Sequence, residues 1–219
     1  MKKGIIVSFE GIDGCGKTTQ AKLFYNYLRE KRIDCVYLHE PGSTETGEKI
    51  RNLLLDSKKF IYHWCELFLY LASRAQLVYE KIKKEVESGK VVILDRYIHS
   101  TIAYQGYGRG LSIKLIERIH KEFIGEFFPD ITFIIDENPE NLIQFLEKKK
   151  KDRIENESIE FQKRVREGYM KIAKKDEKVK IIKRKAIEET FKEIIDEWEK
   201  FLNESRRSKK NNKKSKRKR

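Results

Sequence analysis

A glycine-rich loop between an apolar run and a helical segment constrains this chain more than any other feature. Residues 11–18 read Gly-Ile-Asp-Gly-Cys-Gly-Lys-Thr and satisfy the pattern G-x-x-x-x-G-K-[ST]. A mostly apolar run, residues 5–9, precedes this loop, and a segment with helical spacing follows it to about residue 31. Its glycines let backbone N–H groups point inward, and the start of the helix adds partial positive charge. We therefore expect a phosphate-binding hollow.

The pattern assigns chemistry to individual residues of this loop. Lys17 supplies a point charge for the outer phosphates of a nucleotide, and the Thr18 hydroxyl is placed to bind Mg²⁺. Cys15 is at a helix N-terminus, where a thiolate is favoured. We expect the whole loop to contact the phosphates: Gly11, Ile12, Asp13, Gly14, Cys15, Gly16, Lys17 and Thr18.

Short apolar runs alternate with longer stretches of helical period along the rest of the chain. This pattern is typical of repeated βαβ units and predicts an α/β fold of the P-loop NTPase type. We expect a five-stranded parallel sheet covered by helices on both faces, with strands at residues 5–9, 35–39, 91–94, 131–135 and 179–182. Ligands bind at the carboxyl ends of such strands. The domain is expected to cover residues 1–203.

Polar and charged residues follow the end of the third expected strand. Asp95 is placed as the metal-associated aspartate of a P-loop enzyme, and the adjacent Arg96 offers a planar fork for a second phosphate group. Arg74 shares a helix face with apolar residues, so it requires either a ligand or a structural ion-pair partner. Four side chains after Arg96 can stack on or hydrogen-bond a flat heterocycle: Ser100, Thr101, Tyr104 and Gln105.

The net charge of +14 is concentrated at the C-terminus. Residues 204–219 contain ten Lys or Arg and one acid, whereas the preceding 203 residues carry 39 basic and 34 acidic side chains. This basic tail lacks apolar residues, so we expect it to be disordered, with nucleic acid bound only non-specifically if at all. A second basic run, residues 148–153, is either a solvated face or part of a mobile lid over residues 147–157 that closes on phosphates.

Cysteine usage and hydropathy predict a soluble cytoplasmic protein. The three cysteines are odd in number and widely spaced, which argues against a disulfide framework and against a zinc site. The longest apolar run, residues 67–72, is too short to cross a bilayer. No membrane partner is therefore expected.

Six segments taken together resemble the thymidylate kinase family, over the chain from the phosphate loop to about Tyr169. The resemblance implies transfer of the γ-phosphoryl group of ATP to dTMP, giving dTDP and ADP, with Mg²⁺ and in a homodimer. The segments that carry it are Phe9-Glu10-Gly11-Ile12-Asp13-Gly14-x-Gly16-Lys17-Thr18-Thr19, Glu40-Pro41-Gly42-x-Thr44, Ala72-x-Arg74-x-Gln76, Asp95-Arg96-Tyr97, Ser100-Thr101-x-Ala103-Tyr104-Gln105-Gly106 and Asp152-Arg153-x-Glu155.

The resemblance also implies a role for each matching residue. Arg96 would grip the acceptor phosphate, Tyr104 would pack against its sugar, and Tyr70 would stack on thymine where the family commonly has phenylalanine. Arg74 would contact the thymine edge. The implied catalytic group is Asp13, Lys17, Asp95, Arg96 and Arg153, with Mg²⁺ at Thr18 and Asp95. The implied dTMP contacts are Asp13, Pro41, Tyr70, Arg74, Arg96, Ser100, Thr101, Tyr104 and Gln105.

Two departures from the family pattern affect these roles. Family members that lack a basic residue inside the phosphate loop use arginines of the lid, and Cys15 makes this chain similar to that type. We hypothesise that Arg153, with one lysine of residues 148–151, stabilises the transferring phosphoryl group. His39 and Ser43 replace an arginine and a glycine common in the turn after the second strand. The resemblance therefore does not assign acceptor contacts to this turn.

Three alternative functions remain at this point. Another P-loop kinase, acting on a different nucleoside or monophosphate, would need the same two phosphate sites. A nucleotide-dependent switch would need a guanine-reading N-K-x-D motif, which is absent. A polyanion-binding protein that only holds ATP would depend on the basic tail.

We expect the homodimer contact on the helix predicted over residues 64–88, where Phe68 and Leu69 lie away from the core face.

Overall fold

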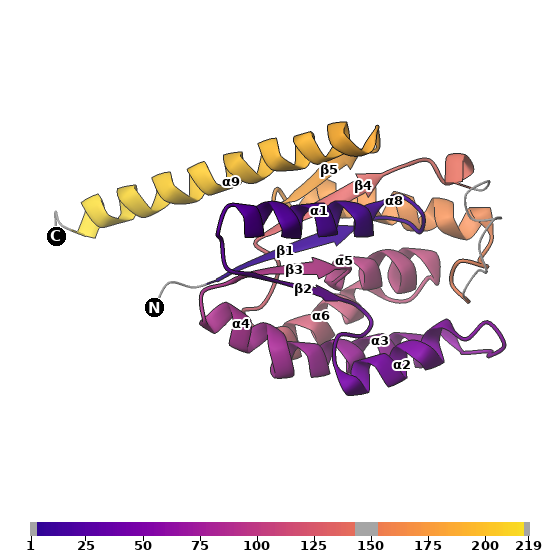
Figure 1. Ribbon diagram of the computed structural model, residues 1–219. Coiled ribbons are helices and arrows are strands. Elements are labelled where there is room, and N and C mark those ends of the chain that lie inside the picture. The colour runs from indigo at the N-terminus through magenta and orange to yellow at the C-terminus, as the bar shows by residue number, and fades with distance from the viewer. Residues whose placement is uncertain (1–3, 143–152, 217–219) are drawn as a thin grey trace.

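Five parallel strands form the centre of the protein (Figure 1). The computed structural model describes residues 4–142 and 153–216, with side chains described as far as Ser205. The strand order is β2-β3-β1-β4-β5, with bounds β1 Ile5–Glu10, β2 Cys35–His39, β3 Val91–Asp95, β4 Ile131–Asp136 and β5 Val179–Lys183. Each strand contains the apolar run predicted for it, and the predicted α/β fold is confirmed.

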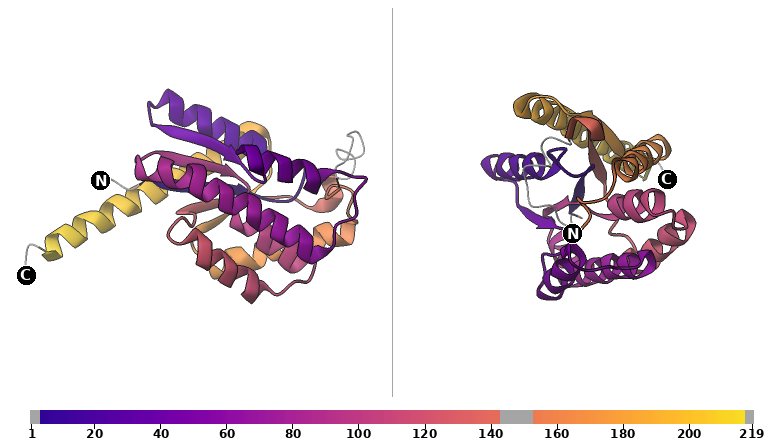
Figure 2. Two further views of the ribbon diagram at one scale, coloured as in Figure 1. Left: turned by 90° about the horizontal axis from the view of Figure 1, so that it is seen from below. Right: turned by 90° about the vertical axis from the view of Figure 1, so that its right-hand side faces the viewer.

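Helices cover both faces of this sheet (Figures 1 and 2). On one face lie α1 (Lys17–Glu30) and α9 (Ile187–Lys216). The opposite face carries α3 (His63–Leu77), η1 (Val78–Ile82), α4 (Lys83–Glu87) and α6 (Ile113–Ile124), and α2 (Glu45–Leu55) packs on α3. Next to them, α5 (Ile98–Thr101), η2 (Ile102–Gly108) and α8 (Ile159–Lys175) pack against one another.

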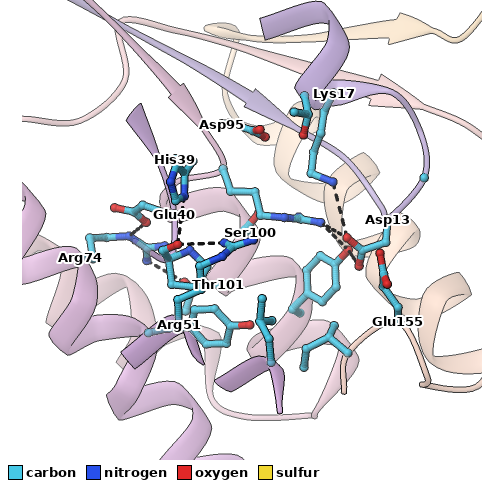
Figure 3. Close-up of a pocket in the computed structure, with 18 of the residues that line it drawn as sticks. Asp13, Lys17, His39, Glu40, Arg51, Arg74, Asp95, Ser100, Thr101 and Glu155 are labelled. Carbon is cyan, nitrogen blue, oxygen red and sulfur yellow. Dashed lines mark hydrogen bonds and ion pairs between the residues drawn. The ribbon is translucent and has the colours of Figure 1, made fainter. Parts of the chain in front are cut away.

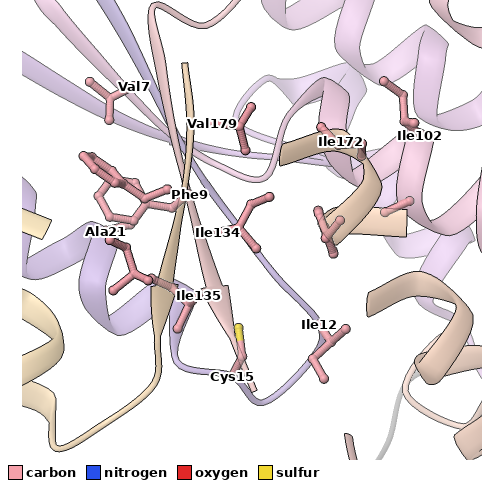
Figure 4. Packing of buried hydrophobic residues seen from close by; sticks show 14 of the residues in the cluster. Val7, Phe9, Ile12, Cys15, Ala21, Ile102, Ile134, Ile135, Ile172 and Val179 are labelled. Atoms are coloured by element: carbon pink, nitrogen blue, oxygen red, sulfur yellow. The ribbon is translucent and has the colours of Figure 1, made fainter. Parts of the chain in front are cut away.

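Successive residues of β1 face opposite layers, which explains the apolar run that only Ser8 interrupts. Phe9 packs on Phe24 of α1, with ring centroids 5.5 Å apart, and Phe24 packs on Trp198 of α9 at 5.3 Å. Val7 belongs to the same cluster, part of which is drawn in Figure 4. Ile6 belongs instead to the cluster on the other face. A strand buried on both sides requires apolar residues at consecutive positions.

The register of the strands brings three of their carboxyl ends level. Asp95 of β3 is aligned with Phe9 of β1 on one side and with His39 of β2 on the other. The loops that follow these three strands therefore meet at a single edge of the sheet. This edge is where a ligand is expected in a parallel α/β fold.

The helix predicted over residues 64–88 is interrupted. It starts as α3, widens into the π-helical turn η1 at Val78–Ile82, and ends as α4. A second π-helical segment, η2, follows α5 and contains both Tyr104 and Gln105. Single wide turns of this kind recur at functional sites because they change the direction in which side chains project.

Helix α9 extends farther than the sequence predicted. We expected disorder from Glu204, whereas the helix continues to Lys216. Lysine and arginine favour helix, and a helix already nucleated by its packed first half extends at little further cost. The domain limits 1–203 and 204–219 remain a prediction. Within the described ranges no helix, α9 included, combines the length and apolar character needed to cross a membrane.

Candidate active site

A pocket of about 720 Å³ opens at the carboxyl ends of β1, β2 and β3. Fourteen of the residues predicted to form the site line this pocket: Asp13, Gly14, Gly16, Lys17, Thr18, Pro41, Tyr70, Arg74, Asp95, Arg96, Ser100, Thr101, Tyr104 and Gln105. Four predicted residues do not line it: Gly11, Ile12, Cys15 and Arg153. The structure thus brings both expected phosphate-binding groups to one cavity.

The phosphate loop is bent by glycines with positive φ. Gly14 and Gly16 have φ of 80° and 96°, in the region that favours glycine. At Gly11 a Cβ atom would lie 2.6 Å from the carbonyl oxygen of Ile135, so only glycine fits there. Gly16 caps α1 without a side-chain hydrogen bond, which leaves the first N–H groups of the helix available to an anion.

Cys15 differs from its sequence-based expectation. The side chain is buried in the apolar cluster under the loop (Figure 4). Burial raises the pKa of its thiol, and this effect outweighs the nearby Lys17 and the helix N-terminus. The expected thiolate is therefore wrong, and Cys15 contributes to the pocket through the backbone shape of the loop.

Lys17 and Arg96 both contact the carboxylate of Asp13. Lys17 Nζ lies 3.5 Å from Asp13 Oδ1 (Figure 3), and Arg96 Nη2 lies 2.5 Å from the same oxygen. Burial alone would raise the pKa of Asp13, but Arg96 and Lys17 lower it to about 2. Asp13 is therefore anionic at neutral pH and keeps two cations close together in the free protein.

Arg96 is held by more than its ion pair. Its Nη1 donates to the carbonyl oxygen of Gly11 at 3.1 Å and to Ser100 Oγ at 3.0 Å, and its guanidinium lies 4.9 Å from the ring centroid of Tyr104. The Tyr104 hydroxyl donates to Asp13 Oδ2 at 2.8 Å. Arg96 adopts a φ of 70°, which a side-chain-bearing residue rarely keeps unless its surroundings require it.

Arg74 forms a structural ion pair, which is one of the two roles that the sequence allowed for it. It is almost fully buried, and its Nε lies 2.6 Å from Glu40 Oε2. Nη1 donates to Thr101 Oγ1 at 2.6 Å and Nη2 to the Tyr97 carbonyl oxygen at 2.9 Å. His120 Nε2, 2.8 Å away, accepts from Nη1, because burial and the adjacent Arg74 lower the pKa of His120 to about 2. Arg74 still lines the pocket, so a ligand would meet an arginine whose position is already fixed.

Two oxygen donors in the pocket fit a magnesium ion. Asp95 Oδ2 accepts a hydrogen bond of 2.8 Å from the Tyr37 hydroxyl, while Oδ1 is buried and has no partner among the described residues. Thr18, which carries a hydroxyl group, is an exposed residue that lines the same pocket. Mg²⁺ prefers hard oxygen ligands and commonly takes one or two protein groups together with substrate phosphates. Asp95 Oδ1 and Thr18 are the residues that would hold it, and the unpartnered oxygen supports this assignment.

Two residues that line the pocket, Arg51 and Glu155, were not among the predicted site residues. Arg51 of α2 reaches the pocket and donates from Nη1 to the Pro41 carbonyl oxygen at 2.9 Å. Glu155 projects into the pocket near Asp13 (Figure 3), although the sequence offered it only as part of a motif. Arg51 lies in a helix whose pattern shows no special spacing, so only the folded chain reveals its position.

In the turn after β2, Glu48 contacts both residues that differ from the family pattern, His39 and Ser43. Ser43 has a φ of 63°, and its N–H donates to Glu48 Oε1 at 2.6 Å. His39 Nε2 lies 3.2 Å from the same oxygen. Gly42 has a φ of 130°, a conformation that favours glycine, and a Cβ atom there would also meet Glu48 Oε1 at 2.4 Å. Serine in place of glycine at position 43 thus depends on a carboxylate that fixes the turn.

The comparison with known proteins identifies the family. A family model described as thymidylate kinase matches residues 9–194. The chain belongs to the thymidylate kinase family. The thymidylate kinase of Thermoanaerobacter sp. (strain X514) is 45% identical over 202 residues, which cover 91% of this chain and 100% of the relative. The thymidylate kinase of Fervidobacterium nodosum is 44% identical over 199 residues, covering 90% and 100%.

A solved thymidylate kinase has the same fold. The crystal structure of thymidylate kinase from Ehrlichia chaffeensis is 35% identical in sequence to this chain and superimposes with a TM-score of 0.76. The match covers 90% of this chain and 99% of that structure. This member of the thymidylate kinase family thus has the sheet and helices of a solved relative along nearly its whole length.

Proposed function

We propose that the protein transfers the γ-phosphoryl group of ATP to dTMP, giving dTDP and ADP. The observation that carries this proposal is the shared contact of Lys17 and Arg96 with Asp13. Lys17 belongs to the nucleotide-binding loop and Arg96 to the end of the neighbouring strand. Two phosphate groups bound by these cations would face each other across one pocket, as phosphoryl transfer requires.

On the donor side, the start of α1 and Lys17 bind the phosphates of ATP. The uncapped N–H groups of α1 donate hydrogen bonds to the phosphate oxygens, and Lys17 reaches the outer phosphates. Magnesium bound by Thr18 and Asp95 would neutralise charge on these oxygens when present. Tyr37 keeps Asp95 oriented through its hydrogen bond.

On the acceptor side, Arg96 binds the phosphate of dTMP and Tyr104 lies against the sugar. Burial raises the pKa of Tyr104 well above its usual value, so its hydroxyl stays protonated and remains fixed on Asp13. A tyrosine held in this way would crowd a 2′-hydroxyl, which favours deoxyribose. The base would lie among the remaining pocket residues: Pro41, Tyr70, Arg74, Ser100, Thr101 and Gln105.

The reaction needs no general base. An acceptor phosphate oxygen is already anionic near neutral pH, so catalysis consists of positioning and charge neutralisation. Lys17 and Arg96 supply fixed positive charge within the described residues. A further cation from residues 148–151 is part of the proposal, and those lysines lie outside the described residues.

We also propose that the protein is a cytoplasmic homodimer that pairs through α3. Trp64 and Phe68 are 45% and 56% exposed on this helix, and their rings stack with centroids 6.1 Å apart. Exposed aromatic rings that lie together mark an interaction surface. Phe68→Glu should convert a dimer to a monomer in sedimentation velocity, with Tyr79→Glu, an exposed aromatic of η1, as the matched control. Equal sedimentation of wild type and Phe68→Glu would reject this surface.

The function is tested by ADP release with five acceptors: dTMP, dUMP, UMP, CMP and thymidine. The proposal predicts the highest kcat/KM for dTMP, a large loss with the ribose analogue UMP, and no reaction with thymidine, which lacks the phosphate that Arg96 binds. Lys17→Ala should abolish measurable transfer. A near-normal rate for Lys17→Ala, or a preference for another acceptor, would overturn the proposal.

A further inference from the structure

A fully buried glutamate of α3 lies between the pocket and residues 153–157. Glu66 is 0% exposed, and its carboxylate accepts hydrogen bonds from three side chains. Gln105 Nε2 lies 2.8 Å from Oε1, Arg109 Nη2 lies 3.0 Å from Oε2, and Arg153 Nη1 lies 2.7 Å from Oε2. Burial would raise the pKa of Glu66, but Arg109, Gln105 and Arg153 together lower it, so the carboxylate is anionic.

Arg153 is occupied by this carboxylate and by the backbone of α2. Its Nε donates to the Leu54 carbonyl oxygen at 2.8 Å, and its own N–H donates to the Leu55 carbonyl oxygen at 3.3 Å. The side chain is directed to Glu66 and does not line the pocket. Arg153 Nη2 is buried and has no hydrogen-bond partner among the described residues. Because Arg153 does not line the pocket, direct contact with a transferring phosphoryl group would require its guanidinium to move out of the buried pair with Glu66.

The same network attaches residues 153–157 at both ends. Arg109 bridges Glu66 and Glu157, with Nη1 2.6 Å from Glu157 Oε1, and its guanidinium lies 4.5 Å from the ring centroid of Phe161 in α8. Arg153 holds the beginning of the segment and Glu157 holds its end. The residues between these anchors include Ile154 and Glu155, which line the pocket.

Gln105 connects the network to the base side of the pocket. An ionised carboxylate only accepts hydrogen bonds, so the Gln105 group that faces Glu66 must be its NH₂. The amide of this pocket-lining residue is therefore fixed in one orientation. Without Glu66 the amide could rotate, and the residues 153–157 would lose one of their two anchors.

We propose that Glu66 is a positioning residue for dTMP: its single buried carboxylate fixes Gln105 and, through Arg153 and Arg109, holds residues 153–157 as a wall of the acceptor pocket. Arg153 then acts through Glu66 and makes no contact with the transferring phosphoryl group. The inference deepens the proposed dTMP kinase activity and rests on it. It replaces the earlier hypothesis that gave Arg153 a direct catalytic role.

The kinetic test uses Arg153→Gln, Glu66→Gln and the double variant. Glutamine keeps the shape and a hydrogen-bonding oxygen at position 66, whereas alanine would leave a cavity and remove the carboxylate that Arg153 contacts. Each single variant should raise KM for dTMP about tenfold, the size expected for the loss of one charge-assisted hydrogen bond, with kcat within about threefold of wild type. In the double variant the KM should be about equal to that of Glu66→Gln alone, because the change at Arg153 breaks a link that the change at Glu66 has already broken. The control is Lys163→Gln on α8, which removes an exposed ion pair with Glu140 and should leave kcat and KM for dTMP unchanged.

Hydrogen–deuterium exchange supplies a readout that is independent of activity. Exchange in a peptide covering residues 153–158 should accelerate in Glu66→Gln and Arg153→Gln, with peptides of β1 and β3 unchanged. A fall in kcat of a hundredfold for Arg153→Gln at constant KM for dTMP would overturn the inference and restore the direct role. Additive KM effects in the double variant, or wild-type exchange and kinetics in both single variants, would also overturn it. If the wild type does not phosphorylate dTMP, the proposed function fails, and the exchange data alone still decide whether Glu66 anchors the segment.

Discussion

Replacement of Arg96 by lysine tests whether the acceptor phosphate is bound by a guanidinium fork. In the free protein Nη2 is paired with Asp13, and Nη1 donates to Gly11 and Ser100. Lysine keeps the charge but has three donors on one atom, so it cannot keep Asp13 and Ser100 while also donating two parallel hydrogen bonds to a phosphate. The loss of one charge-assisted hydrogen bond to phosphate costs about 2–3 kcal/mol, which is about 30- to 150-fold in kcat/KM.

The assay for Arg96→Lys is coupled ADP release, with dTMP and ATP varied in turn. We expect kcat/KM for dTMP to fall by the factor above, and KM for ATP to stay within about threefold of wild type. Arg29→Lys, an exposed arginine of α1, is the matched control for a change of arginine to lysine. A variant within threefold of wild type for dTMP, or an equal loss for both substrates, would refute the assignment of Arg96 to the acceptor.

Three further predictions follow from other parts of the structure. Tyr37→Phe should raise about tenfold the Mg²⁺ concentration that gives the half-maximal rate, because Asp95 loses its orienting hydrogen bond. With a non-hydrolysable ATP analogue, the Mg²⁺ concentration needed for thermal stabilisation should rise by a similar factor. Burial raises the pKa of Glu40 from 4.5 to about 7 in spite of Arg74, so the folded protein holds a proton that the unfolded chain releases. The free energy of unfolding should then decrease by about 3 kcal/mol between pH 4.5 and 7, at 1.36 kcal/mol per pKa unit, and urea titrations of Glu40→Gln should lack this slope. Deletion of residues 204–219 should leave kcat and both KM values unchanged; a loss of activity would mean that the basic segment belongs to the catalytic domain.

The sequence predicted the strands and the phosphate loop well because both depend on local pattern. Strands buried on two faces require consecutive apolar residues, and the loop requires glycines at fixed spacing before Lys17. Asp95 and Arg96 were identifiable because they follow such a strand directly. In each case the physical constraint acts within a few neighbouring residues.

The sequence could not predict features that depend on distant partners. Arg74 and Arg153 both carry charge that needs a partner, but nothing local shows that the partners are Glu40 and Glu66. Cys15 follows the helix-terminus rule in sequence, and its burial under the loop reverses the expected shift in pKa. The extension of α9 past Glu204 likewise depends on a helix already anchored by packing.

The most direct measurement of the central claim follows the phosphoryl group itself. ATP labelled in its γ-phosphate is incubated with the wild-type protein and dTMP, and the products are separated by chromatography. Because Lys17 and Arg96 meet at Asp13 in one pocket, the label should appear in dTDP in an amount equal to the ADP formed. Label recovered as inorganic phosphate, with dTMP unchanged, would show that the two anion sites do not work on a common phosphoryl group and would contradict the account.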